Sequence, residues 1–180
     1  EFGSQSVPEH ADFIDTSNWP ELDWDHLAVH HGLQRWVFDQ RVPPAAFATF
    51  DEWRRATQTY QAELVRHHVE VLRRLKYRPT GGFCVFALND ASPMVSWSLL
   101  DHERAPKLAW HTLRQACQPV LVVADRPPSL VTPDEHLQID IHVVNDLRVP
   151  VDPAVVEVAA HWAGGEQRWR FGGAVGPDDC

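Results

Sequence analysis

The sequence predicts an α/β part followed by an all-β part, with a boundary near residue 119. Before this boundary, a helix-periodic segment, a short apolar run and a second helix-periodic segment follow one another. This is the order of elements in the last part of a (β/α)8 TIM barrel. After the boundary, apolar and polar residues alternate in several short segments separated by turn residues, which is typical of an immunoglobulin-like β-sandwich.

The first 50 residues show neither period, and four prolines interrupt them, so we expect an irregular segment. One short helix is expected near residues 23–32, ended by Gly32. Asp51 is a candidate N-cap, and apolar residues after it recur at spacings of three and four. This pattern predicts one long amphipathic helix over residues 51–76, which ends before a Pro and a Gly pair.

Residues 83–88 form an uninterrupted apolar run and predict a strand that is buried on both faces. A polar turn over residues 89–93 follows the run directly. Helical spacing then predicts a second helix over residues 107–117, and Pro119 closes this segment.

Beyond Pro119 the apolar residues predict strands rather than helices. Residues 120–123 form a short apolar strand, and residues 137–143 and 156–162 alternate between apolar and polar side chains. A Gly-Gly pair after residue 163 leads into a further strand near residues 169–171.

Both predicted domains are shorter than complete ones. A TIM barrel needs about 250 residues, and an immunoglobulin-like sandwich needs about seven strands. We therefore expect residues 1–118 to be the C-terminal part of a barrel, with about two βα units, and residues 119–180 to be a partial immunoglobulin-like β-sandwich. The first residue is Glu1 and not Met, so we also expect the remainder of the same polypeptide to lie upstream.

Composition and charge narrow the class of partner. The 180 residues are 44% hydrophobic and 23% charged, which is a globular composition. The net charge is −9 without a basic stripe, which argues against a nucleic-acid partner. No apolar stretch approaches the roughly 20 residues that span a bilayer, so no membrane partner is expected. The three cysteines are widely spaced, and free thiols favour a reducing, cytoplasmic compartment.

Two segments carry a family resemblance. Residues 1–8 read EFGSQSVP, and residues 82–98 read GFCVFALNDASPMVSWS, followed by Asp101 and by a Pro-Lys pair that ends at Lys107. They resemble the Ser-Glu-Tyr/Phe-Gly-x-Gln-Ser and W-Q-L-N-D-x-W-P-x-x-S-W-S segments of glycoside hydrolase family 2, in particular of its β-mannosidase branch. Together with the helix between them and the strands after them, the resemblance covers nearly the whole chain.

The resemblance implies that Glu1 is the catalytic nucleophile at the end of the seventh barrel strand. A retaining glycosidase uses two carboxyl groups about 5–5.5 Å apart. The second one, in an Asn-Glu pair at the end of the family's fourth strand, has no counterpart in this sequence. We therefore expect the 180 residues alone to be inactive. The chemistry requires no metal and no organic cofactor.

Four further residues are candidates for substrate binding. Asn89 and Asp90 would either contact a sugar hydroxyl or hold the loop through an Asx turn. Trp97 would either cover the C–H face of a sugar or pack under the loop. Phe86 stands where family members carry Trp. With Ala87 in place of Gln and Ser92 in place of Trp, it would change the shape of the sugar-binding subsite.

The preferred hypothesis is a fragment of a retaining exo-β-glycosidase that hydrolyses terminal β-linked sugars, β-mannosides foremost, through a covalent glycosyl-enzyme. Its partner would be the carbohydrate substrate. The alternative from another class is a non-catalytic module that binds carbohydrate or protein through its aromatic residues. A third hypothesis, a metal-dependent protein built on His26 and His30, lacks the Glu of a zinc motif and a third ligand at a telling spacing.

Overall fold

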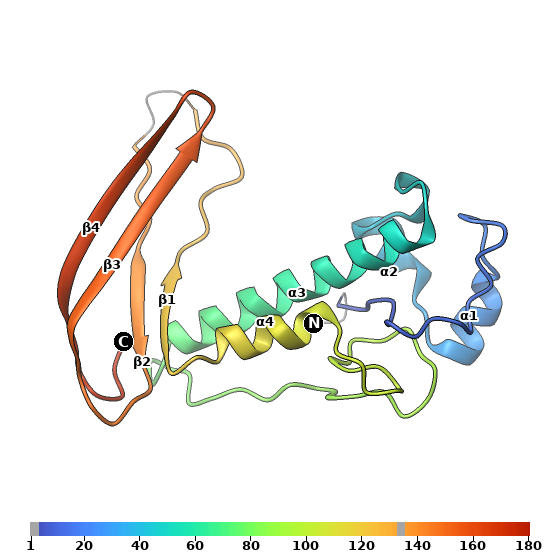
Figure 1. Ribbon diagram of the computed structural model, residues 1–180, viewed down its shortest axis with the longest axis horizontal. Coiled ribbons are helices and arrows are strands. Elements are labelled where there is room, and N and C mark those ends of the chain that lie inside the picture. The colour runs from blue at the N-terminus through green and yellow to red at the C-terminus, as the bar shows by residue number, and fades with distance from the viewer. Residues whose placement is uncertain (1–3, 133–135) are drawn as a thin grey trace. The chain divides into compact units, whose positions relative to one another are not determined.

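The computed structural model describes residues 4–132 and 136–180, and it contains helices followed by small antiparallel sheets (Figure 1). The chain forms two compact units. One comprises the residues up to 69 together with residues 83–116, and the other comprises residues 70–82 and 117–180. Within the described residues, no helix is both long and apolar enough to cross a membrane.

The first unit begins with an irregular segment that contains short helices, of which the sequence predicts only the first. The elements are α1 (Trp24–His31), α2 (Arg35–Arg41) and a 3-10 turn (Pro44–Ala46). Asp23 caps α1, because its carboxylate accepts a hydrogen bond from the backbone N–H of His26 at 3.0 Å. Gly32 ends the helix in the left-handed conformation with φ 68°. The helix predicted near residues 23–32 is therefore confirmed.

The long predicted helix is α3 (Phe50–Arg74), which is confirmed and ends two residues earlier than expected. Its first half carries Trp53, which is fully buried in the centre of the hydrophobic core with Phe38 and Val7. The indole N–H of Trp53 donates to the carbonyl of Val42 at 2.9 Å, so the buried polar atom is satisfied.

The second predicted helix is α4 (Leu108–Ala116), which is confirmed and packs along α3 (Figure 1). Ala62 of α3, Ala109 of α4 and Leu99 form a buried cluster between them. Because Ala62 and Ala109 are small, the two helix backbones can approach closely at this point.

The predicted buried strand over residues 83–88 is wrong. The segment is extended but forms no strand, and Phe86 is 80% exposed. Among the described contacts of residues 83–88, only the carbonyl of Leu88 forms backbone hydrogen bonds. It accepts from the N–H groups of Leu99 and Leu100 at 3.1 and 2.9 Å. A strand requires a hydrogen-bonded neighbour, and the apolar composition of the segment does not supply one.

The described part of the second unit contains two two-stranded antiparallel sheets. One pairs β1 (Val120–Ala124) with β2 (Ile141–Asn145), and the other pairs β3 (Val151–Trp162) with β4 (Gly165–Val175). The strands predicted at residues 120–123, 156–162 and 169–171 are thus confirmed. The strand expected over residues 137–143 is confirmed only from Ile141 onward, where β2 begins.

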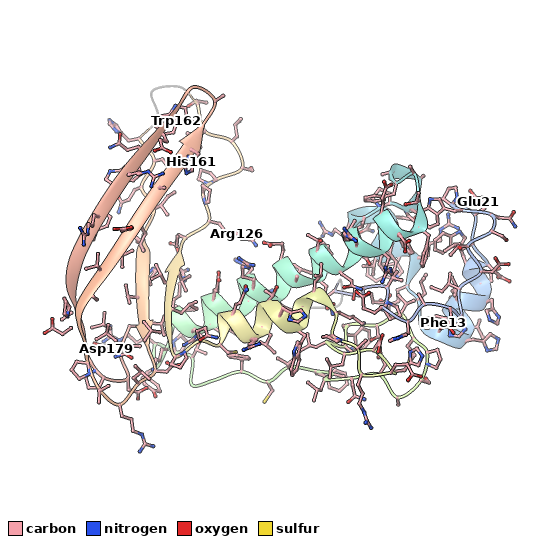
Figure 2. The ribbon with its side chains drawn as sticks, viewed as in Figure 1. Phe13, Glu21, Arg126, His161, Trp162 and Asp179 are labelled. Atoms are coloured by element: carbon pink, nitrogen blue, oxygen red, sulfur yellow. The ribbon has the colours of Figure 1, made fainter. Side chains whose placement is uncertain are left out.

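The β3–β4 hairpin has one apolar and one charged face. Val156 lies opposite Phe171, and Val158 lies opposite Trp169, so their side chains share one face. The other face carries charged pairs, for example Glu157 and Arg170 at 3.8 Å. His161 and Trp162 end β3 beside the turn (Figure 2). Much of the apolar face is exposed.

Ion pairs hold residues 70–82 within the second unit. Asp146 accepts from Arg73 at 2.7 Å and from Lys76 at 2.6 Å, and Asp178 lies 2.6 Å from Lys76. Arg74 pairs in turn with a further aspartate, Asp125. Burial would raise the pKa of Asp146, but Lys76 and Arg73 hold it below its ordinary value.

Candidate functional site

A cavity of about 440 Å³ in the first unit is lined by four of the five predicted site residues. These four are Phe86, which lies within the apolar run, and Asn89, Asp90 and Trp97, which follow it. The fifth, Glu1, lies outside the described residues. The cavity has a size that is usual for small-molecule sites.

Two aromatic rings form one wall of this cavity. The ring centroids of Phe86 and Trp97 lie 6.4 Å apart with an interplanar angle of 31°. Phe86 is exposed, and Trp97 is half-buried. Their apolar faces can cover the C–H face of a sugar. The exposed Asn89 on the same lining offers an amide that can hydrogen-bond a hydroxyl group.

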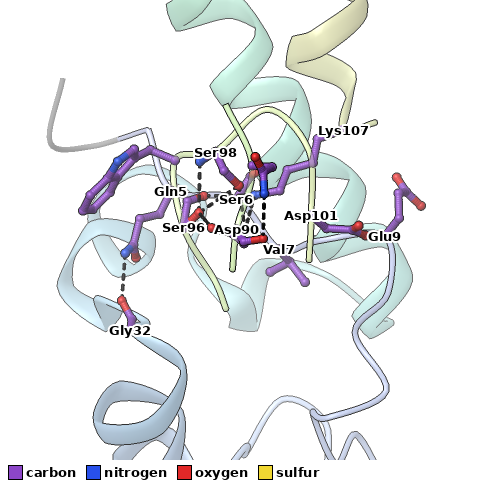
Figure 3. Close-up of polar contacts among 12 residues, drawn as sticks. Gln5, Ser6, Val7, Glu9, Gly32, Asp90, Ser96, Ser98, Asp101 and Lys107 are labelled. Carbon is purple, nitrogen blue, oxygen red and sulfur yellow. Dashed lines mark hydrogen bonds and ion pairs between the residues drawn. The ribbon is translucent and has the colours of Figure 1, made fainter. Parts of the chain in front are cut away.

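Asp90 lies in the loop that follows the apolar run, and two serines of the same loop hold its side chain (Figure 3). The hydroxyl of Ser96 donates to one carboxylate oxygen at 2.6 Å, and the hydroxyl of Ser98 donates to the other at 2.6 Å. These lengths are typical of charge-assisted hydrogen bonds. Both oxygens are therefore engaged within the protein, and of the two roles expected for Asp90 the contacts favour holding the loop. The side chain of Asn89 donates to the backbone carbonyl of Asp90 at 3.1 Å.

Lys107 is a fully buried cation beside this loop. Its Nζ donates to the carbonyl of Ser96 at 3.2 Å and lies 3.8 Å from the carboxylate of Asp90. Burial disfavours the charged form and lowers the pKa of Lys107 to about 8, although Asp90 and Asp101 offset part of this effect.

Asp101 organises the end of the same loop. Its side chain is fully buried and accepts hydrogen bonds from the backbone N–H groups of His10, Glu103 and Ala105 at 3.0, 3.0 and 2.8 Å. Burial would raise the pKa of Asp101, but the bonds from His10 and Ala105 outweigh it and hold the pKa below its ordinary value.

Two glutamines complete the site and were not singled out from the sequence. Gln5 lines the cavity, donates to the carbonyl of Gly32 at 2.8 Å and accepts from the N–H of Gln34 at 2.8 Å. Gln61 on α3 donates to the carbonyl of Trp97 at 2.8 Å. Gln5 belongs to the first family-like segment and could have been found there. Gln61 carries no such signal, because a polar residue on an amphipathic helix is expected to face solvent.

The histidines form pairs without a metal-binding group. The rings of His26 and His30 lie 4.6 Å apart on α1, and the ring of His31 stacks on Phe13 at 4.4 Å. Within residues 4–132 and 136–180, no three His, Cys, Asp or Glu side chains come together as potential metal ligands.

Comparison with known proteins identifies relatives of this chain. No protein-family profile matches the sequence. Over 69 residues the chain is 33% identical to β-mannosidase B from Thermothelomyces thermophilus, a match that covers 38% of this chain and 8% of that protein. The fold matches the crystal structure of β-D-mannosidase from Dictyoglomus thermophilum with a TM-score of 0.61 and 15% identity. That match covers 81% of this chain and 18% of that chain.

These matches place the chain among relatives of glycoside hydrolases, and its mixture of helices and small antiparallel sheets matches part of such an enzyme. Within that class, the chain is homologous to β-mannosidases. The resemblance read from the two sequence segments is thereby confirmed. The chain spans less than a fifth of the solved β-mannosidase structure.

Proposed function

We propose that this chain is part of a retaining exo-acting β-glycosidase that removes terminal β-mannosyl residues. The observation that carries the proposal is the cavity, where the two aromatic rings of Phe86 and Trp97 lie beside Asn89. Such a combination of apolar faces and an amide suits one sugar ring. Homology to β-mannosidases supports the choice of sugar.

The proposed architecture follows the sequence hypothesis. Residues 1–118 would contribute the C-terminal part of a TIM barrel, and residues 119–180 would contribute part of an immunoglobulin-like sandwich. The remainder of a longer polypeptide would supply the other barrel strands. The match to less than a fifth of a solved β-mannosidase supports this assignment.

The proposed mechanism needs two carboxyl groups. Glu1 precedes the cavity-lining Gln5 by four residues and would attack the anomeric carbon, forming a glycosyl–enzyme ester as the glycosidic C–O bond breaks. A second carboxyl group, from the remainder of the polypeptide, would protonate the leaving oxygen. It would then take a proton from the water that hydrolyses the ester.

Sugar binding is tested by titrating the chain with methyl β-mannoside and measuring affinity by calorimetry. Trp97→Ala removes one stacking face and should weaken binding about tenfold. Trp36→Ala is the matched control, because Trp36 is 56% exposed on α2 and does not line the cavity. Equal affinity in the two variants would contradict a sugar site at this cavity.

Catalysis is tested with an aryl β-mannoside. One carboxyl group cannot perform both steps, so the 180-residue chain should show no turnover above the uncatalysed rate. Turnover that Glu1→Gln abolishes would show a complete active site and would refute the proposal that the chain is one part of it.

A second candidate function is a non-catalytic carbohydrate-binding module. The departure at Phe86, whose ring is 80% exposed, favours this alternative, since an exposed ring can bind a glycan without a closed catalytic pocket. Affinity for glycans that falls in Trp97→Ala and stays unchanged in Glu1→Gln would support the module. A loss of affinity in both variants would support the glycosidase.

A further inference from the structure

The backbone on both sides of Trp97 is held by buried side chains. Lys107 donates to the carbonyl of Ser96, which is the peptide group immediately before Trp97, at 3.2 Å. Gln61 donates to the carbonyl of Trp97 itself at 2.8 Å and to that of Ser98 at 3.1 Å. Gln61 and Lys107 have no exposed surface, so no bulk water competes with them for these carbonyls in the structure.

The side chains that flank the indole are fixed as well. Ser96 and Ser98 both donate to Asp90, and the N–H of Ser98 donates to the hydroxyl of Ser96 at 2.9 Å. The hydroxyl of Ser6 donates to Gln61 at 2.7 Å and orients its amide. Figure 3 shows the contacts of Asp90 and Lys107 converging around Ser96 and Ser98. The neighbours of Trp97 are thus restrained through both backbone and side chains.

We propose that Gln61 and Lys107 are positioning residues for Trp97, which fix the place of its indole at the cavity by holding the two peptide carbonyls that flank its Cα. The assignment of Trp97 to sugar binding rests on the proposed function. The positioning itself rests on the contacts alone.

A role in stability alone explains Lys107 less well. A buried ammonium group loses its hydration, and the charged groups that face Lys107 are Asp90, at 3.8 Å, and Asp101. Burial outweighs both carboxylates and lowers the pKa of Lys107 to about 8. An apolar side chain would fill the same space without this cost, but it would leave the carbonyl before Trp97 without its cation donor.

Fluorine NMR of the chain labelled with 5-fluorotryptophan tests the proposal, with the resonance of Trp97 assigned from Trp97→Phe. Gln61→Leu and Lys107→Met should each shift or broaden this resonance. Each variant should also weaken sugar binding on the order of tenfold. Gln58→Leu is the matched control, because Gln58 is equally buried on α3 but holds Val7 and Leu108 instead.

Two further measurements keep the test decisive if a leucine or methionine variant fails to fold. Gln61→Glu keeps the shape but removes the donor, and Lys107→Arg keeps the cation. The first should move the Trp97 resonance, and the second should leave it near its original position. In the unmodified chain, the resonance should shift with a midpoint near pH 8, the pKa of Lys107, and Lys107→Met should abolish this transition.

A Trp97 resonance that keeps its position and width in folded Gln61→Leu and Lys107→Met would overturn the positioning role. The resonance is read without sugar. A failure of sugar binding in the unmodified chain would therefore count against the proposed function and leave the positioning role standing.

Discussion

Asp101 carries a negative charge in a place without solvent, because its side chain is fully buried. Three backbone N–H groups and the ring of His10 surround the carboxylate. These donors replace water, and the carboxylate in turn shapes the turn that leads toward Lys107. One residue thus organises the loop next to the cavity.

Asp101→Asn should reduce the free energy of unfolding by about 3 kcal/mol at pH 7, because an amide places its own N–H groups against some of these donors. The folded chain holds the pKa of Asp101 below its unfolded value. The stabilisation is therefore complete above about pH 4 and is lost as the pH falls through the folded-state pKa.

Urea denaturation between pH 2 and pH 7 measures this effect. The difference between the unmodified chain and Asp101→Asn should shrink below about pH 4. Asp12→Asn serves as the control, since Asp12 is exposed and its loss should change little at any pH. A difference that stays constant down to pH 2 would argue against an ionised Asp101.

The sequence segment around Trp97 indicated which residues to consider, but it could not assign their roles. Phe86, Asn89, Asp90 and Trp97 lie in one continuous stretch, so their closeness at a cavity was predictable. The burial of Asp90 was not predictable from the sequence. It depends on serine hydroxyls six and eight residues later turning toward the same carboxylate, which is a matter of backbone geometry rather than of residue type.

Among the elements, the segment over residues 83–88 shows the limit of pattern reasoning. Its apolar composition is that of a buried strand, but pairing and burial depend on neighbours that residue type does not specify. Helices do not have this dependence, since their hydrogen bonds are local. The helices α1, α3 and α4 were accordingly predicted to within a few residues.

Two valines test whether the segment over residues 83–88 is less buried than the loop that follows it. Val85 in the segment is 39% exposed, whereas Val95 in the following loop is fully buried. Val85→Ala should change the free energy of unfolding by about 0.5 kcal/mol, and Val95→Ala should reduce it by about 2 kcal/mol because it leaves a cavity. Chemical denaturation measures both, and equal losses would show that the segment is as buried as the loop.

Ion pairs hold the C-terminal end of α3 and the residues that follow it. Asp146→Asn would weaken the bonds from Arg73 and Lys76 together and should reduce the stability of the second unit by about 1–2 kcal/mol. Arg73 is nearly fully buried and has the larger share, because its bond to Asp146 lies away from solvent, where a charged pair contributes more.

Thermal unfolding followed by circular dichroism at low and high salt measures this loss. Glu157→Gln is the control, because its pair with Arg170 lies at 3.8 Å on the exposed hairpin and should contribute almost nothing. The melting temperature of Asp146→Asn should also depend less on salt than that of the unmodified chain. Identical melting of the two variants would contradict an ionic attachment.

For the whole molecule, the order of elements was predictable from the sequence, namely helices before residue 119 and strands after it. Which strands pair with one another was less predictable. The described strands form two separate two-stranded sheets, and β3 pairs with β4 across the two-residue turn at Ala163 and Gly164. The pairing of β1 with β2 crosses a long connection, and no local signal in the chain specifies such a partner.

The two compact units are not consecutive in the chain, since residues 70–82 group with the strands and not with the helices around them. Gene fusion or recombination near residue 118 would therefore separate Lys76 from Asp146 and Asp178. A strand-containing part acquired from another protein would need carboxylates at equivalent places, so these two parts of the chain are expected to evolve as one inherited block.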